Sequence, residues 1–276
     1  MPAPARHWGC WRPRPAFWAR SPSPPAPTPG AAQPVREGEQ PVLRSGKLLH
    51  LVRSDLPLPR EFYARPVLSV ARDCIGKHLV HATALGTTVG RIVEAEAYRG
   101  PEDRAAHSFG GRRTPRTEVM FGPPGYAYVF LVYGLHWHFN IVTTAMGAPH
   151  AVLIRAVEPL AGVELMAQRR ALAPSHRDLT NGPGKLCTAF GIDRRAYGAD
   201  LTQPPLFLCD PGGAARPRVA RSPRIGVDYA GEWAARPWRF YDRDSRHVSR
   251  LPARRGLGER GSSSKPSSSK SSTRGD

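Results

Sequence analysis

The sequence predicts an α+β fold: a single compact domain around a curved antiparallel β-sheet, with flanking helices, a protruding β-hairpin and disordered N- and C-terminal tails. Segments that alternate in polarity, or that are dense in β-branched and aromatic residues, outnumber those with helical spacing of apolar residues. Residues 1–45 are rich in Pro and Arg, and residues 251–276 are rich in Ser and Lys. Such segments bury too little apolar surface to offset the entropy lost on folding. We therefore expect the folded domain to cover residues 46–250.

The first half of this region is predicted to contain one helix and two strands. A helix is expected over Glu61–Ala71, starting or interrupted near Pro66, because proline lacks the backbone donor that a helix interior needs. Polarity alternates over His78–Thr83 and Thr87–Tyr98, which predicts two strands joined by a short glycine-containing turn. The stretch 99–125 is rich in Gly, Pro and Arg, so we expect a long loop there.

The second half is predicted to contain a hairpin, further strands and two helices. Tyr126–Tyr133 is dense in aromatic and β-branched residues, ends at a glycine and is followed by Trp137–Thr144, which together resemble a hairpin. Ala151–Val157 is a further strand. Apolar residues near helical spacing predict a helix over Pro159–Leu172, and a short helix, Lys185–Phe190, follows a Gly-Pro-Gly segment. The remaining predicted strands are short: Leu206–Cys209, Arg224–Asp228 and Arg239–Tyr241.

The chain is strongly basic, with 40 Lys and Arg against 22 Asp and Glu and a formal net charge of +18. Part of this excess lies in the two predicted tails, but the foldable region also remains positive. Such a charge favours a polyanionic partner, most commonly nucleic acid. The alternative is an organism whose proteins are generally rich in arginine, because Arg far outnumbers Lys here.

The cysteines and the apolar runs restrict the compartment. Cys10, Cys74, Cys187 and Cys209 are scattered without Cys-x-x-Cys spacing, so neither a metal ribbon nor a disulfide framework is indicated and a reducing compartment fits best. No apolar run approaches the roughly 20 residues that a membrane-spanning helix needs. We therefore expect no association with a membrane.

Acidic residues mark the most informative strand. Because side chains alternate along a strand, one face should carry Ile92, Glu94, Glu96 and Tyr98, and the other Val93, Ala95 and Ala97. The small alanines would permit close packing and leave the acidic face toward a cleft. A carboxylate beside an aromatic ring in a cleft suits a general base acting on a stacked substrate. A solvated sheet face is the alternative.

Two further segments could carry chemistry. An aromatic-rich hairpin over Tyr126–Tyr133 on a basic protein could stack on bases and wedge into a base stack, or could simply be a core strand. Arg155 ends an apolar strand, and an unpaired buried guanidinium is very costly. It either pairs with a carboxylate or orients a water or phosphate, and both remain open.

Taken in order, several segments resemble the alkyladenine (3-methyladenine) DNA glycosylase family, over about residues 60–245. These segments are Arg-Ile-Val-Glu-Ala-Glu-Ala-Tyr (91–98), Gly-Pro-Glu-Asp-x-Ala-Ala-His-Ser (100–108), Thr-Pro-Arg (114–116), Tyr-Gly (133–134), Asn140, Leu-Ile-Arg-Ala-Val-Glu-Pro (153–159), Gly-Pro-Gly-Lys-Leu-Cys (182–187) and Arg-Ile-Gly-Val-x-Tyr-Ala-Gly-Glu-Trp-Ala-x-x-Pro-x-Arg-Phe-Tyr (224–241). No single motif is decisive, but agreement of this many ordered segments is not expected by chance.

The resemblance implies a monofunctional glycosylase of base excision repair. Such an enzyme flips alkylated or deaminated purines (3-methyladenine, 7-methylguanine, hypoxanthine, ethenoadenine) out of duplex DNA. It then hydrolyses the N-glycosidic bond and leaves an abasic site without lyase activity. The resemblance also implies no metal or organic cofactor and a monomer that acts on double-stranded DNA with damaged purines. The bacterial cytoplasm is the favoured location, or the nucleus or mitochondrion if the source is eukaryotic.

The same resemblance implies residue roles. Glu96 would be the general base that deprotonates the attacking water, with Arg155 and the backbone carbonyl near Ile225 holding that water. The implied base-pocket residues are Tyr98, His107, Phe130, Asn140 and Leu153. Phe130 and His136 depart from the human enzyme's pattern and are expected close to the pocket. The implied DNA contacts are Tyr133 as the wedge, together with Arg112, Thr114, Arg116, Met120 and Lys185.

Two interpretations from other classes stay open at the level of sequence. A non-catalytic basic DNA- or RNA-binding module would explain the charge and the aromatic hairpin. A metal-dependent nuclease would use the acids Glu94, Glu96, Glu102 and Asp103, although the spacing of His and Cys residues indicates no metal cluster.

Overall fold

The structure, a computed structural model, describes residues 56–213 and 216–249. The predicted leader, tail and domain boundaries lie outside these residues. The strands are β1 (His78–Thr83), β2 (Gly86–Tyr98), β3 (Ala127–Val132), β4 (His136–Thr143), β5 (His150–Ala161), β6 (Leu206–Cys209), β7 (Val219–Ser222) and β8 (Arg239–Asp242). The helices are α1 (Arg60–Tyr63), α2 (Val67–Asp73), α3 (Val163–Arg170) and α4 (Pro183–Phe190), with 3-10 helices η1 (Gly100–Glu102), η2 (Phe109–Gly111), η3 (Glu118–Phe121), η4 (Arg194–Ala196) and η5 (Asp228–Ala235).

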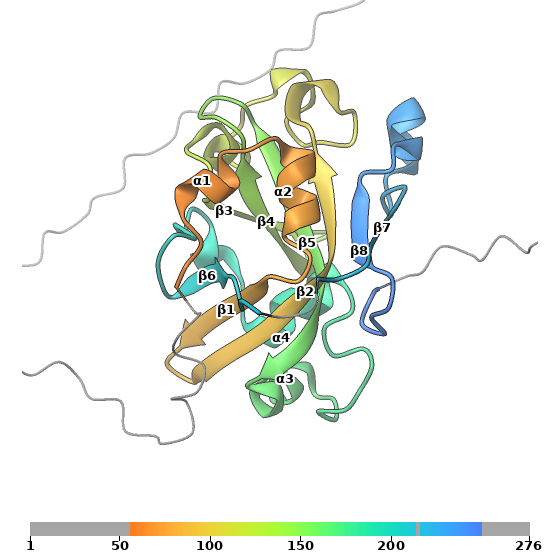
Figure 1. Cartoon of the computed structure of the whole chain (residues 1–276). Helices are drawn as coiled ribbons and strands as arrows, with labels where there is room; N and C mark the ends of the chain where they lie inside the picture. Colours follow the sequence, from red (N-terminus) through yellow and green to blue (C-terminus); the bar gives the residue numbers. More distant parts are fainter. Residues whose placement is uncertain (1–55, 214–215, 250–276) are drawn as a thin grey trace, which may run out of the picture. The chain divides into compact units, whose positions relative to one another are not determined.

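One antiparallel sheet connects all eight strands. Its order is β3-β4-β5-β2-β1-β6, with β8 joining β2 and β7 joining β8 (Figure 1). The long strand β2 pairs with β5 along one edge. Along its other edge it pairs with β1 over its first half and with β8 over its second half. The predicted α+β class and antiparallel sheet are thereby confirmed.

Local sequence signals identified most elements. The strands β1 and β6 match their predicted ranges residue for residue, and the predicted hairpin is present as β3 and β4. The first helix is interrupted near Pro66 as expected, because Pro66 lies at the N-terminal cap of α2 while α1 has already ended. None of the helices in the described part of the chain is long and apolar enough to cross a bilayer.

One predicted helix begins later than expected, one predicted strand is wrong, and one strand, β7, was missed. The helix expected over Pro159–Leu172 is α3, which begins only at Val163 because β5 continues through Ala161. Pro159 has no backbone N–H to donate to a neighbouring strand. It is tolerated there because β4 pairs with β5 only as far as Leu153, so beyond Leu153 that edge of β5 has no strand hydrogen bond to complete. The strand expected over Arg224–Asp228 is a loop, in which Ile225 donates its N–H to a side chain rather than to a neighbouring strand.

The expected alternation along β2 is wrong at one point. The register of β2 against β5 shifts between Ile92 and Glu94 and again between Glu94 and Ala95, a β-bulge that leaves Val93 and Arg155 without directly opposed partners. Ile92 therefore packs in the main core with the alanines of β2, not on the face of the acids. The bulge lies where β2 exchanges β1 for β8 as its neighbour.

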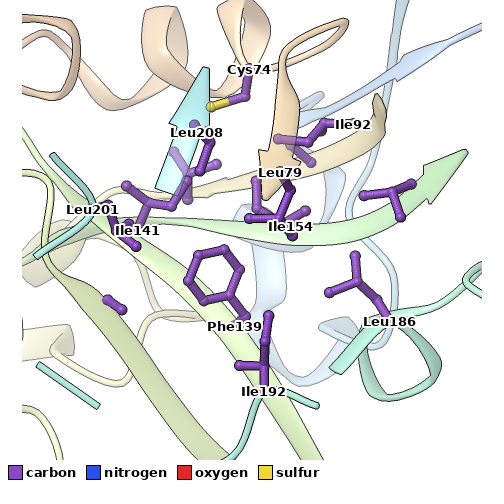
Figure 2. Packing of buried hydrophobic residues seen from close by; sticks show 14 of the residues in the cluster. Cys74, Leu79, Ile92, Phe139, Ile141, Ile154, Leu186, Ile192, Leu201 and Leu208 are labelled. Atoms are coloured by element: carbon purple, nitrogen blue, oxygen red, sulfur yellow. The ribbon is translucent and has the colours of Figure 1, made fainter. Parts of the chain in front are cut away.

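The main hydrophobic core fixes one face of the sheet. Figure 2 shows Leu79, Phe139, Ile154 and Leu186, from β1, β4, β5 and α4, gathered in one cluster, and each is fully buried. Because strand side chains alternate, the neighbours of these residues along the strands must face the other way. The side chains of β2, β3, β4 and β5 that point away from the core lie on the opposite face of the sheet, where they can form a site.

We expect Gly162→Ala to destabilise the domain more than Gly198→Ala. Both glycines have positive φ, +67° and +77°, which costs a side-chain-bearing residue about 1–2 kcal/mol. An added Cβ at Gly162 would also lie 2.2 Å from the Thr87 carbonyl oxygen, whereas Gly198 has open space. Urea unfolding followed by tryptophan fluorescence should show the lower midpoint for Gly162→Ala, and equal midpoints would contradict the close packing described here.

Candidate active site

A band of side chains, all but Leu153 polar or aromatic, covers the sheet face opposite the core. It consists of Tyr128 and Phe130 from β3, His138 and Asn140 from β4, Leu153 and Arg155 from β5, and Glu94, Glu96 and Tyr98 from β2. One cross-strand row runs through the middle of this band: Tyr128 opposes Asn140, Asn140 opposes Leu153, and Leu153 opposes Glu96. Residues up to 57 positions apart in the chain, Glu96 and Leu153, are therefore direct neighbours in this row.

A cavity of about 320 Å³ opens over this band. The structure brings to its lining every residue expected in the base pocket, namely Tyr98, His107, Phe130, Asn140 and Leu153. Arg155, Ile225 and Tyr133 also line it. The volume falls at the lower end of the range typical of small-molecule sites.

Glu96 is fully buried and hydrogen-bonds Tyr98 and Arg155, two residues that line the cavity. Its Oε2 accepts hydrogen bonds from Arg155 Nη1 at 3.2 Å and from the Tyr98 hydroxyl at 2.9 Å. Its Oε1 accepts a hydrogen bond from the Ile225 backbone N–H at 2.8 Å. A carboxylate offers about four lone-pair sites. Among the described residues, these three donors leave one site free, on Oε1 beside Ile225.

Glu94 holds Arg155 in place. Arg155 Nε donates to Glu94 Oε1 at 2.8 Å, and Arg239 Nε donates to the same oxygen at 2.7 Å. The backbone and hydroxyl of Ser249 add two further donors. Burial alone would raise the pKa of Glu94, but Arg155 and Arg239 together hold it below its usual value. Glu94 therefore stays anionic, and Arg155 pairs with two carboxylates at once.

A second buried ion pair positions the loop that carries Ile225. The side chains of Arg224 and Asp103 are both fully buried, and Arg224 Nη2 donates to Asp103 Oδ1 at 2.9 Å while Nη1 contacts Oδ2. Arg224 Nη1 also donates to the Ala97 carbonyl at 3.0 Å, and its guanidinium lies 4.7 Å from the centre of the Tyr98 ring. The pair thus ties this loop to the end of β2 and places the Ile225 N–H at Glu96.

Aromatic rings and a neutral histidine form the far wall of the cavity. His107 Nδ1 lies 2.7 Å from the Tyr128 hydroxyl, and the His107 and Phe130 rings are 4.5 Å apart between centroids. Burial, with smaller contributions from Arg116 and Arg112, lowers the pKa of His107 to about 4. The ring is therefore uncharged at neutral pH.

The β3–β4 hairpin presents Tyr133 at the rim of the cavity. Its side chain is 92% exposed, and Leu131 and Tyr229 are also exposed at the same rim. Tyr133, Gly134 and Leu135 connect β3 to β4, and the Leu135 N–H donates to the Val132 carbonyl at 3.0 Å. Tyr133 and Gly134 both have positive φ, 50° and 70°, a conformation that an aromatic residue rarely adopts. A bulky ring held out at a tight turn is suited to enter a stack of bases.

The remaining residues expected to contact DNA differ in their surroundings. Arg112 and Arg116 are exposed, and Arg116 lines the cavity with its guanidinium 5.7 Å from the Phe130 ring centre. Thr114 is half-buried and hydrogen-bonds Thr117. Two residues do not fit the expectation well. Met120 is only 1% exposed and lies in the cavity wall, and Lys185, away from the cavity, pairs with Asp178 at 3.1 Å.

Several residues of the site were not expected from the sequence. Tyr128 and His138 line the cavity and could have been found from strand alternation, since they lie two residues from Phe130 and Asn140. His136, by contrast, is exposed and outside the cavity lining. No local signal links Asp103 to Arg224, which are 121 positions apart.

The acids proposed for a nuclease are engaged by arginines. Glu94 and Glu96 pair with Arg155, and Glu94 also pairs with Arg239. Glu102 pairs with Arg99, and Asp103 pairs with Arg224. Residues 56–213 and 216–249 hold no group of three or more His, Cys, Asp or Glu side chains that could bind a metal ion. The acids thus serve as partners of guanidinium groups in this fold.

Comparison with known proteins agrees with the resemblance seen in the sequence. The family described as methylpurine-DNA glycosylase matches residues 61–246. A protein of Desulfitobacterium hafniense is 51% identical over 199 residues, which cover 70% of this chain and 98% of that protein. One of Myxococcus xanthus is 52% identical over 195 residues, covering 71% and 94%. One of Methanocella arvoryzae is 51% identical over 193 residues, covering 70% and 96%. All three carry the name "Putative 3-methyladenine DNA glycosylase".

We expect Asp103→Asn to lower the free energy of unfolding by about 3–5 kcal/mol, because it leaves the buried guanidinium of Arg224 without a counter-charge. Glu118→Gln is the matched control. It removes an exposed partner of Arg113, a solvent-screened pair, and should leave the free energy of unfolding nearly unchanged. Urea titrations of both variants test this, and similar losses in the two would show that the Arg224–Asp103 pair does not stabilise the loop.

Proposed function

This chain belongs to the methylpurine-DNA glycosylase family, and on that basis we propose that it excises damaged purines from duplex DNA by hydrolysing the N-glycosidic bond. The observation that supports this best is the anchored carboxylate of Glu96, with one lone pair unused among the described residues, in contact with residues that line an aromatic cavity. The proposed substrates are alkylated and deaminated purines: 3-methyladenine, 7-methylguanine, hypoxanthine and ethenoadenine.

Catalysis begins with extrusion of the damaged nucleotide, because the glycosidic bond is inaccessible inside a duplex. Extrusion costs a few kcal/mol, and least at damaged pairs. The exposed Tyr133 ring fills the space that the nucleotide leaves. Base–aromatic stacking is worth on the order of 1–3 kcal/mol, enough to offset much of this cost. Arg112 and Arg116, both exposed, neutralise phosphates nearby.

The extruded base enters the cavity between aromatic side chains. Tyr98, His107 and Phe130 provide the rings. An alkylated purine carries a positive charge and is attracted to electron-rich ring faces. The neutral state of His107 matters here, because an imidazolium would repel such a base. An undamaged base, with its ordinary charge and shape, gains less binding free energy from these aromatic rings.

Glu96 then activates water at its free lone pair. The carboxylate accepts a proton from the water. Hydrogen bonds from Arg155, Tyr98 and the Ile225 N–H hold the carboxylate in one orientation. Its negative charge also stabilises positive charge developing on the sugar. One carboxylate is enough for cationic bases, since these are already good leaving groups, whereas ordinary glycosidases need a second acid. A neutral base such as hypoxanthine must also gain a proton as the glycosidic bond breaks, and we propose that a water molecule delivers it.

The product is an abasic site in an uncut strand. The described side chains that line the cavity include arginines but no lysine, so no amine stands ready to form a Schiff base with the sugar. We infer that one subunit acting on double-stranded DNA releases the base by hydrolysis alone.

We expect Glu96→Gln to lower the single-turnover rate of base excision by at least about 10²-fold, in line with loss of a general base. Affinity for lesion-containing DNA should change little, since the amide keeps the size and most hydrogen bonds of the carboxylate. The assay uses duplexes with 7-methylguanine or hypoxanthine in EDTA, with free base and alkali-labile sites measured separately. Glu164→Gln, at an exposed carboxylate on α3, is the control and should match the unaltered chain.

The outcomes of this assay separate the candidate functions. Base release, with strand breaks only after alkali, supports a monofunctional glycosylase. Normal excision with weakened binding in Glu96→Gln would remove Glu96 from the chemistry. A folded, unaltered chain that binds DNA but releases no base from any lesion would identify a non-catalytic binding module instead.

We expect Tyr133→Ser to weaken binding to a duplex with a stable abasic-site analogue by about 5- to 100-fold, the equivalent of one lost stacking interaction. Tyr133→Phe keeps the ring and should bind within about threefold of the unaltered chain on the same reasoning. Fluorescence anisotropy at fixed salt gives the dissociation constants. An unchanged constant for Tyr133→Ser would rule out the wedge.

A further inference from the structure

Tyr229 is an exposed aromatic side chain at the mouth of the cavity for which the proposed mechanism has no use. It lies in η5 and lines the cavity, yet 73% of it is exposed to solvent. Exposed apolar side chains beside a cavity mark a surface that a partner covers. Among the described residues of this lining, Tyr133 is the other exposed aromatic one, and it already has the role of a wedge.

The backbone on both sides of Tyr229 is anchored. Val227 is 4% exposed and Ala230 is fully buried, and both pack in one small cluster with Ala105. The Ala230 N–H donates to the Val227 carbonyl at 2.9 Å, which closes a tight turn that contains Tyr229. Since the neighbouring side chains are held inside, the side chain of Tyr229 is held outside by a fixed backbone.

The hydroxyl group of Tyr229 fixes the direction of its ring. It donates a long hydrogen bond, 3.4 Å, to the carbonyl oxygen of Ala105, a residue that also lines the cavity. The ring therefore reaches from η5 toward Ala105, along one side of the cavity mouth. Most of its surface is left open to an occupant of that mouth.

The position of Glu96 decides which part of an extruded nucleotide comes next to this ring. The unused lone pair of Glu96 is on Oε1, beside the Ile225 N–H, and in the proposed mechanism the attacking water lies there. The water must approach C1′ of the sugar closely while the base lies against the aromatic far wall. The sugar therefore lies toward residues 225–227, which line the cavity and lead along the chain to Tyr229.

We propose that Tyr229 is a substrate-binding residue whose ring packs against the deoxyribose of the extruded nucleotide and holds C1′ near the water at Glu96. The inference rests on the proposed glycosylase function and adds a contact with the sugar to it. Packing the ring against the C–H groups of the sugar removes apolar surface from water. Because the sugar is the same for every damaged base, the contact should serve all lesions equally.

The first test compares binding to two duplexes, of which only one presents an extruded sugar. One duplex contains a stable abasic-site analogue, which keeps the sugar and lacks the base, and the other is undamaged. Fluorescence anisotropy with the full chain at fixed salt gives both dissociation constants. We expect Tyr229→Ala to weaken binding to the analogue duplex by about 3- to 15-fold, the equivalent of covering roughly half of a large apolar side chain. Binding to undamaged DNA, which depends on phosphate contacts, should stay within about twofold.

The second test measures excision of two lesions. Single-turnover rate constants for 7-methylguanine and hypoxanthine are determined with the chain in excess over duplex DNA. Without the contact C1′ is less well placed for the water, so Tyr229→Ala should lower both rate constants by a similar factor of about 10.

Two further variants make the result specific. Tyr229→Phe keeps the ring and loses one long, solvent-accessible hydrogen bond, so it should stay within about threefold of the unaltered chain. Leu85→Ala removes a similarly exposed apolar side chain, 77% exposed, from the turn between β1 and β2, outside the cavity lining, and should change none of these constants. Thermal unfolding verifies that each variant is folded, and Tyr229→Asn replaces the alanine variant if that one melts below the assay temperature.

Each outcome decides the matter. Weaker binding confined to the analogue duplex, with a similar loss of both rates, supports the sugar contact. Equal weakening for both duplexes would assign Tyr229 to the ordinary DNA backbone, and a rate loss for one lesion alone would assign it to the base. Either result overturns the proposal, as do unchanged dissociation constants or unchanged rates. Failure of the unaltered chain to release either base would instead overturn the proposed function itself.

Discussion

The site depends on one buried cluster of charges, in which the guanidinium of Arg155 lies between the carboxylates of Glu94 and Glu96. Burying three charges is expensive unless each is neutralised and hydrogen-bonded. Here the further donors Arg239, Ser249, Tyr98 and the Ile225 N–H complete the cluster. Removing any member would leave a charge or a polar atom uncompensated, so the cluster ties β2, β5, β8 and the loop at Ile225 into one arrangement.

The bulge between β2 and β5 makes this cluster possible. In a regular ladder Arg155 would have a directly opposed partner on β2, and Ile92 would share the face of the acids. The register shifts leave Arg155 without such a partner and direct Ile92 into the core. The same irregularity lies where β2 changes its neighbour from β1 to β8, so β8 can bring Arg239 opposite Glu96 and beside Glu94. A local break in pairing thus serves both packing and chemistry.

The cavity combines a rigid interior with an apolar exposed rim. Its floor is sheet, its far wall is a set of contacting rings, and its histidines are held neutral. Tyr133, Leu131 and Tyr229 remain exposed at its mouth, an arrangement that stability alone would not favour. Exposed apolar side chains beside a preformed cavity are expected where a partner supplies the missing contacts, and a stacked nucleic acid has the complementary surface.

Much of this protein was determined by local sequence alone. Alternating polarity and β-propensity identified β1, β6 and the hairpin. The ordered motifs assigned Glu96, Tyr98, His107 and Arg155 to one site. Both signals are contained in short stretches of consecutive residues, so they can be recognised without the tertiary structure. Tertiary structure decided the rest. The end of β5, the loop at Arg224, the bulge and the pairing of Asp103 with Arg224 each depend on which distant segment lies alongside. A hydrogen bond or an ion pair between residues more than a hundred positions apart leaves no periodicity in the chain, so only the folded sheet reveals it.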